Sequence, residues 1–96
     1  MRKKCYNKYM IKIWFKLIIE DKIIKDVVFT YNEHFSEENF NFVIGEVCNT
    51  FDCPAPIILT KHINQFLNFN TTTFTKDDFV ERFDFDKLVL ENAYED

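Results

Sequence analysis

The sequence predicts an α+β fold, in which an N-terminal antiparallel β-hairpin and a C-terminal strand form one small sheet packed by two helices. Two observations carry this prediction. Apolar and polar residues alternate with period two in the first third of the chain, whereas the middle third has apolar residues at helical spacing. The 96 residues suffice for one hydrophobic core, so we expect a single domain over residues 1–96.

The first strand is expected at residues 9–20, where every second residue is apolar without a polar interruption. Residues 20–22 are expected to form a turn, and residues 23–30 the returning strand. A last strand is expected at residues 85–91. The uninterrupted face of the first strand consists of Tyr9, Ile11, Ile13, Phe15, Leu17 and Ile19.

The register of this hairpin follows from one acidic residue. If Phe15 pairs with Val27, Lys16 lies opposite Asp26 and the carboxylate stays out of the core. A slip by one residue would bury Asp26 beside Leu17, because such a slip moves every side chain to the other face. The first register therefore predicts Ile23, Val27 and Phe29 on the core face.

The same register leaves a second apolar face on the hairpin. We expect one helix to cover each face, because a large apolar patch is rarely left bare on a soluble monomer. Trp14 would then belong to a core; otherwise it would anchor an interface with another chain. The residues of this second face are Met10, Trp14, Ile18, Ile24 and Val28.

The first helix is expected to begin after Ser36, whose hydroxyl can cap the first turn, and to end before Pro54. Phe35 before the cap and Phe40 in the helix have the spacing of a hydrophobic staple. The apolar stripe continues through Val43, Ile44, Val47, Cys48 and Phe51.

A second, shorter helix is expected after a cap at Thr60, carrying Ile63, Phe66 and Leu67. The apolar residues 57–59 before it could form a short strand. Residues 70–73 are expected to be a loop, and residues 74–83 fit either a helical turn or irregular chain.

Glycine is confined to Gly45. A phosphate-binding loop, a dinucleotide-binding fingerprint and a nucleophile elbow all require glycines at fixed spacing, so these functional classes are excluded. We expect a protein that is not an enzyme and that binds no cofactor.

Cys48, Cys53 and His62 form the one candidate metal or nucleophilic cluster. Their spacing lacks the close cysteine pairs typical of zinc sites, and Cys48 falls on the apolar helical stripe. We therefore expect reduced thiols in a cytoplasmic protein and no metal site. Both histidines, His34 and His62, are expected to be solvated.

Charge is distributed unevenly along the chain. Residues 1–30 carry eight basic and three acidic side chains, residues 31–60 five acidic and none basic, and residues 61–96 four basic and eight acidic. No run of residues is apolar and long enough to suggest a membrane span.

The densest acidic run alternates with aromatic residues, Phe74, Phe79, Phe83 and Phe85, which could anchor the segment while the carboxylates face outward. The run suggests a binding surface for a basic protein partner, with a divalent-cation site or a simple solvated face as alternatives. The residues expected to bind the partner are Asp77, Asp78, Glu81, Asp84, Asp86 and, on the hairpin, Trp14.

Two segments carry a resemblance to known proteins: IKIWFKLI at residues 11–18, and LTKHINQFLNFNTTTFTKDDFVERFDFDKLVLE at residues 59–91. Their T-x-F, D-x-F-x-E and F-D spacings resemble those of short proteins from anaerobic low-GC Gram-positive bacteria and their mobile elements. No activity is assigned to that group, so the resemblance implies a habitat and not a chemistry.

These observations favour a non-enzymatic protein-interaction module. Its size, acidity and implied habitat suit an inhibitor, encoded by a phage or other mobile element, of a host nuclease or defence complex, such as an anti-CRISPR protein. The alternative is a nucleic-acid-binding protein that uses its basic, aromatic N-terminal strand. That strand carries Arg2, Lys3, Lys4, Lys8, Lys12 and Lys16, interleaved with Tyr6, Tyr9 and Trp14.

Overall fold

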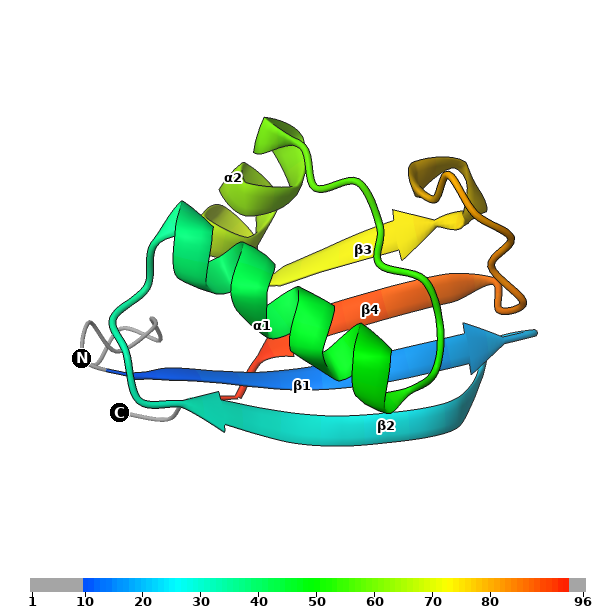
Figure 1. Ribbon diagram of the computed structural model, residues 1–96, viewed down its shortest axis with the longest axis horizontal. Coiled ribbons are helices and arrows are strands. Elements are labelled where there is room, and N and C mark those ends of the chain that lie inside the picture. Colours follow the sequence, from blue (N-terminus) through cyan, green and yellow to red (C-terminus); the bar gives the residue numbers. More distant parts are fainter. Residues whose placement is uncertain (1–9, 94–96) are drawn as a thin grey trace.

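The computed structural model describes residues 10–93 and shows a four-stranded antiparallel sheet with two helices on one face (Figure 1). The strand order is β2-β1-β4-β3. The predicted α+β class, with its N-terminal hairpin and C-terminal strand, is confirmed. The elements are β1 (Ile11–Ile19), β2 (Lys22–Tyr31), α1 (Glu37–Thr50), α2 (Thr60–Phe69), β3 (Thr71–Thr75), the 3-10 helix η1 (Lys76–Asp78) and β4 (Lys87–Asn92).

Strand β1 lies in the middle of the sheet and pairs with β2 on one side and β4 on the other. Phe15 lies opposite Val27 of β2, and Lys16 lies opposite Asp26, which is exposed. The predicted hairpin register is therefore confirmed. On its other side Phe15 pairs with Leu90 of β4, so the N-terminal and C-terminal parts of the described chain meet at β1.

The hairpin contains a bulge that the sequence analysis missed. Leu17 pairs with Lys25, but Ile18 pairs with Ile23, so Ile24 is an extra residue in β2. Between this extra residue and the turn, the alternation of side chains between the two faces of the sheet is reversed, so Ile23 shares a face with Ile18. The expectation that Ile23 belongs to the core was thus wrong: 48% of its surface is exposed.

Helix α1 begins as predicted. The Ser36 hydroxyl accepts a hydrogen bond from the Asn39 N–H at 3.0 Å. The rings of Phe35 and Phe40 lie 5.3 Å apart, which is the expected hydrophobic staple. The buried face of the helix consists of Phe40, Val43, Ile44, Val47 and Cys48.

Helix α2 is capped differently from the prediction. Thr60 is already helical, and the N-cap position belongs to Leu59, which has no side-chain acceptor. Instead, Nδ1 of His62 accepts a hydrogen bond from the Leu59 N–H at 2.9 Å. Among residues 10–93, neither helix is long and apolar enough to cross a membrane.

Strand β3 occupies residues that were expected to begin as a loop. It pairs antiparallel with β4, and Thr72 and Phe74 point into the core with 2% and 0% of their surface exposed. Residues 57–59 are not a strand. The last strand is confirmed, with Leu88 and Leu90 fully buried.

Both helices pack on the same face of the sheet (Figure 1), so the expectation of one helix on each face was wrong. The reason is β3, which widens the sheet and gives α2 a surface beside α1. The face that turns away from the helices is here called the outer face. It carries Trp14, Lys16, Ile18, Ile23 and Val28, and within residues 10–93 neither helix covers it.

Trp14 is half-buried on this outer face by its neighbours within the sheet. Its indole Nε1 donates a hydrogen bond to Asp26 Oδ2 at 2.8 Å, and Lys16 Nζ lies 4.1 Å above its ring. Lys16 also pairs with Glu91 of β4 at 2.7 Å. Trp14 is therefore part of a polar and aromatic cluster and not of the hydrophobic core.

The two faces of β1 can be distinguished by stability measurements. Trp14→Ala should lower the free energy of unfolding by about 1–2 kcal/mol, because it removes partly exposed contacts. Phe15→Ala, at the adjacent and fully buried position, should cost about 3–5 kcal/mol. Urea titration of both variants measures the difference. An equal or larger loss for Trp14→Ala would mean that the outer face is covered by a second core.

Candidate functional site

The acidic segment, residues 76–86, connects β3 to β4 at the end of the sheet that also holds the β1–β2 turn (Figure 1). Its aromatic residues anchor it as expected. Phe79 and Phe83 are 9% and 4% exposed, and their rings stack 3.9 Å apart with an angle of 5° between the planes. The segment therefore holds its carboxylates at defined positions on the rim of the core.

Three of the five predicted carboxylates have partners within the chain. Asp78 Oδ2 accepts a hydrogen bond from the Thr75 N–H at 2.9 Å, and Asp86 Oδ2 accepts one from the Glu20 N–H at 2.8 Å. Asp84 pairs with Arg82 at 2.8 Å, with both side chains exposed. Asp78 and Asp86 thus help to hold the segment against the rest of the fold.

The structure does not bring Trp14 together with the acidic segment. The segment meets β1 at Ile18, whose carbonyl accepts a hydrogen bond from the Asp86 N–H at 2.8 Å. Trp14 lies four residues further along the strand, a distance of roughly 13 Å at the rise of a β-strand. The two predicted parts of the partner-binding site, Trp14 and the acidic segment, are therefore separate surfaces.

A second acidic surface lies on α1, and the sequence analysis missed it. Glu38, Phe42 and Glu46 recur every fourth residue, so they form one ridge along the helix. All three are exposed, Phe42 by 48%, and the Phe42 ring packs 5.1 Å from that of Tyr31. We call these three residues the α1 ridge.

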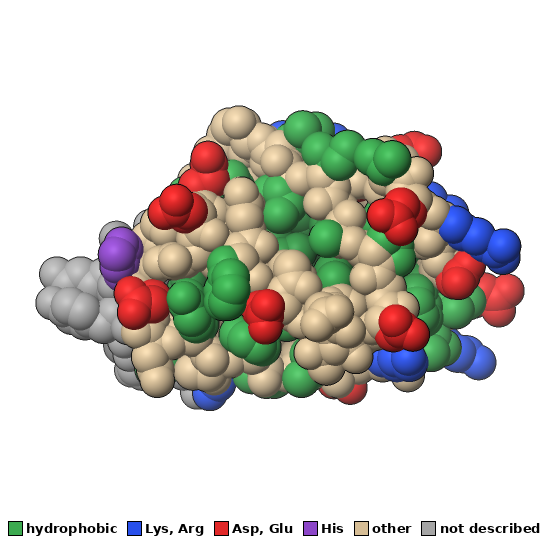
Figure 2. All heavy atoms as spheres, in the orientation of Figure 1, with side chains coloured by type: hydrophobic (Ala, Val, Ile, Leu, Met, Phe, Trp, Pro, Cys, Tyr) green, Lys and Arg blue, Asp and Glu red, His purple; other side chains and the backbone are tan. Residues whose placement is uncertain are grey.

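The stretch of sequence that contains the α1 ridge has no basic residue. Residues 31–60 carry five acidic side chains, all exposed, and no lysine or arginine. The last turn of α1 also lacks a basic residue, although cations are favoured there by the helix dipole. Figure 2 shows red acidic side chains around green hydrophobic ones over the helices, with blue ones gathered mainly at one end.

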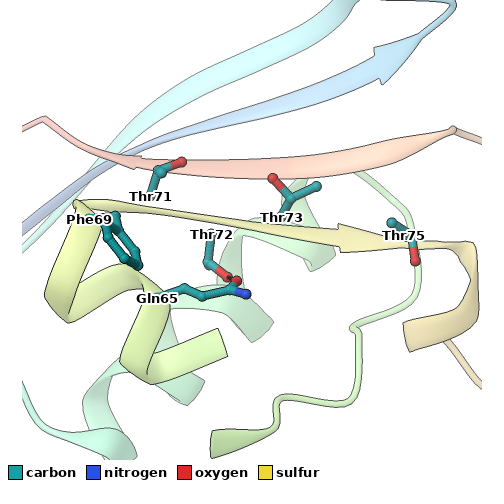
Figure 3. Close-up of a pocket in the computed structure, with 6 residues that line it drawn as sticks. All are labelled: Gln65, Phe69, Thr71, Thr72, Thr73 and Thr75. Carbon is teal, nitrogen blue, oxygen red and sulfur yellow. Dashed lines mark hydrogen bonds between the residues drawn. The ribbon is translucent and has the colours of Figure 1, made fainter. Parts of the chain in front are cut away.

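A groove of about 410 Å³ follows the free edge of β3 beside α2 (Figure 3). In the close-up Thr72 and Gln65 face each other, and the Thr72 hydroxyl donates to Gln65 Oε1 at 2.8 Å. Phe69, 71% exposed, closes one end. None of the lining side chains ionises near neutral pH, so the groove itself holds no acid–base pair. The lining residues are Gln65, Phe69, Thr71, Thr72, Thr73 and Thr75.

The candidate metal cluster does not assemble. Cys48 and Cys53 lie at the end of α1, whereas His62 lies on α2. In the described part of the chain, no three side chains of the types that bind metals come together.

His62 is buried, with 1% of its surface exposed, so the expectation that it is solvated was wrong. Its Nδ1 caps α2, its ring lies 4.3 Å from that of Phe74, and its Nε2 lies 3.6 Å from Asp78 Oδ2. Burial lowers the pKa of His62, and the carboxylate of Asp78 opposes this effect only in part. Because the His62 ring is buried and must accept a hydrogen bond at Nδ1, it is neutral, and its role is structural.

Comparisons of the chain with protein-family models, with curated proteins and with solved structures find no match. The case for a function therefore rests on the geometry and charge of the surfaces described above.

The buried imidazole predicts that the protein loses stability in acid. Because the pKa of His62 is lower in the folded state than its ordinary 6.5, the unfolded chain binds the proton more readily. The resulting loss of stability is absent above pH 6.5, and it grows as the pH falls from 6.5 toward the pKa of His62 in the folded protein. Denaturant titrations between pH 7 and 5 should show a smaller decline in unfolding free energy for His62→Gln than for the parent. An identical decline in both proteins would contradict the assignment.

Proposed function

We propose that the protein is a non-enzymatic interaction module that docks on a basic protein partner through the acidic face of its helical layer. The observation that carries the proposal is the α1 ridge, in which an exposed phenylalanine lies between two glutamates that form no ion pair within residues 10–93. Aromatic residues in the centre of an interface commonly supply much of the binding energy. Flanking carboxylates favour a partner of opposite charge and disfavour others.

A basic partner would also relieve an unfavourable arrangement within the protein. Asp52 lies two residues after the end of α1, and Glu46 lies four residues before it, near the negative end of the helix dipole. Residues 31–60 contribute no lysine or arginine to offset these charges, and of the described residues Lys25 of β2 is the cation that acts on Cys53 at this end of the helix. Lysine or arginine side chains of a docked protein would offset both the carboxylates and the helix terminus.

Within this class, we propose an inhibitor of a nucleic-acid-handling protein, such as a nuclease or defence complex in the same cytoplasm. Proteins of that kind present basic surfaces to the phosphate backbone, and an acidic ridge can compete for them. Asp77 and Glu81 are the exposed carboxylates of the acidic segment that have no hydrogen-bond or ion-pair partner within residues 10–93, so a second contact could form there.

Nucleic-acid binding is the second candidate, and most of the residues expected to carry it lie outside the described part of the chain, namely Arg2, Lys3, Lys4, Tyr6, Lys8 and Tyr9. Of the described basic residues of that strand, Lys16 is engaged with both Glu91 and the Trp14 ring. This engagement leaves Lys16 less available to a phosphate group, so we place nucleic-acid binding after protein binding.

The test compares two charge reversals of equal size. Glu38→Lys with Glu46→Lys changes the α1 ridge, and Asp77→Lys with Glu81→Lys changes the acidic segment. Tagged parent and variants are used to purify complexes from nuclease-treated lysate of cells that express the protein. We expect a basic protein to co-purify in stoichiometric amount with the parent, to be lost from the ridge variant and to remain with the segment variant.

The results distinguish the α1 ridge from the acidic segment as the interface, and protein binding from nucleic-acid binding as the function. The complex should weaken as salt rises from 0.1 to 1 M, because the screening length falls from about 10 Å to about 3 Å. Loss of the partner from the segment variant alone would move the interface to residues 76–86. Recovery of DNA or RNA without a stoichiometric protein would contradict the proposal in favour of nucleic-acid binding.

A further inference from the structure

Helix α1 ends in a Schellman motif that involves two cysteines. The Cys53 N–H donates to the Cys48 carbonyl at 3.0 Å, and the Asp52 N–H donates to the Asn49 carbonyl at 3.1 Å. Asp52, which lies between Asn49 and Cys53, has a left-handed backbone conformation with φ of 58°. This pair of hydrogen bonds folds the chain back on the last turn of the helix.

The motif has a consequence for the side chains. The residues that it joins, here Cys48 and Cys53, regularly contact each other across the end of the helix. Both cysteines are free thiols, and both belong to the hydrophobic cluster of the fold, Cys48 as a buried member and Cys53 packed against it. Cys48 is 1% exposed, whereas Cys53 is only partly buried and can be reached from solvent.

The two thiols have different environments. The hydrogen bond from Cys48 lowers the pKa of Cys53, and Lys25 acts in the same direction, while burial and Asp52 act against it. The same hydrogen bond and burial raise the pKa of Cys48. The more exposed sulfur is thus also the one that ionises first, and the thiolate is the form that attacks a disulfide.

We propose that Cys53 and Cys48 form a thiol pair that reacts with low-molecular-weight disulfides such as oxidised glutathione. The Cys53 thiolate attacks the external disulfide, forms a mixed disulfide and releases one thiolate of the reagent. Cys48 then loses its proton to water and attacks the Cys53 sulfur, which forms the Cys48–Cys53 disulfide and releases the second thiolate. The pair is oxidised by two electrons, and the external disulfide is reduced to two thiols.

The assignment gives each cysteine a distinct role. Cys53 is the attacking residue because it is accessible, and Cys48 is the resolving residue because the Schellman motif holds it beside Cys53. The covalent bond would join the first and last residues of the motif, so it would fix the end of α1 in the conformation already present.

The test is a reaction with oxidised glutathione followed by acid quenching and intact-mass measurement. All variants carry Cys5→Ser, because Cys5 lies outside the described residues. The parent should lose the mass of two hydrogen atoms and keep no glutathione. Cys48→Ala should retain one glutathione on Cys53, and Cys53→Ser should react about tenfold more slowly than Cys48→Ala, as its remaining thiol is buried and protonated.

Thermal melting of each variant before the reaction separates chemistry from folding, and Cys48→Val is a second resolving-site variant if Cys48→Ala is unstable. Two results would overturn the proposal. One is a parent that keeps glutathione without closing the disulfide; the other is equal reaction rates for Cys48→Ala and Cys53→Ser.

Discussion

The packing of β1 is the constraint on which the rest of the structure depends. Its inward residues, Ile13, Phe15 and Leu17, have no exposed surface, and both neighbouring strands pair with it over most of its length. A strand in this position must form backbone hydrogen bonds to strands on both sides, and its inward side chains must also pack beneath the helical layer. The hairpin, the returning strand β4 and the helical layer are therefore all positioned relative to one element.

Because both helices cover the same face of the sheet, the molecule has two unlike surfaces. The outer face uses a cluster of Trp14, Lys16 and Glu91 in place of a second core. The helical layer instead presents the α1 ridge, held by a helix whose opposite side is fully buried. An acidic and partly apolar ridge of this kind is the basis of the proposed recognition of another protein.

The sequence was sufficient to predict the structure where a single residue decided between two alternatives. Asp26 fixed the hairpin register, because the other register would bury a carboxylate, and Ser36 with Phe35 marked the start of α1. It was insufficient where tertiary contacts decide. Residues 71–75 are mostly threonine and become a strand only because β4 offers an edge. The bulge at Ile24 has no local signal, and His62 is buried because its ring caps α2.

The candidate site was predicted only in part, for a similar reason. The acidic run at residues 76–86 is visible as a dense cluster in sequence, but contacts to the β1–β2 turn and to Thr75 occupy two of its carboxylates. The α1 ridge is spread over three turns and therefore less conspicuous, although the four-residue spacing of Glu38, Phe42 and Glu46 could have revealed it.

Native-state hydrogen exchange of the backbone amides of β1 tests the central position of this strand most directly. The account predicts that the amides of Ile13, Phe15 and Leu17 exchange only when the whole protein unfolds, with the highest protection in the chain. Amides of α1 and β3, at the periphery, should exchange through smaller openings. Protection of β1 below that of α1 or β3 would show that the sheet is not organised around β1 and would contradict the account.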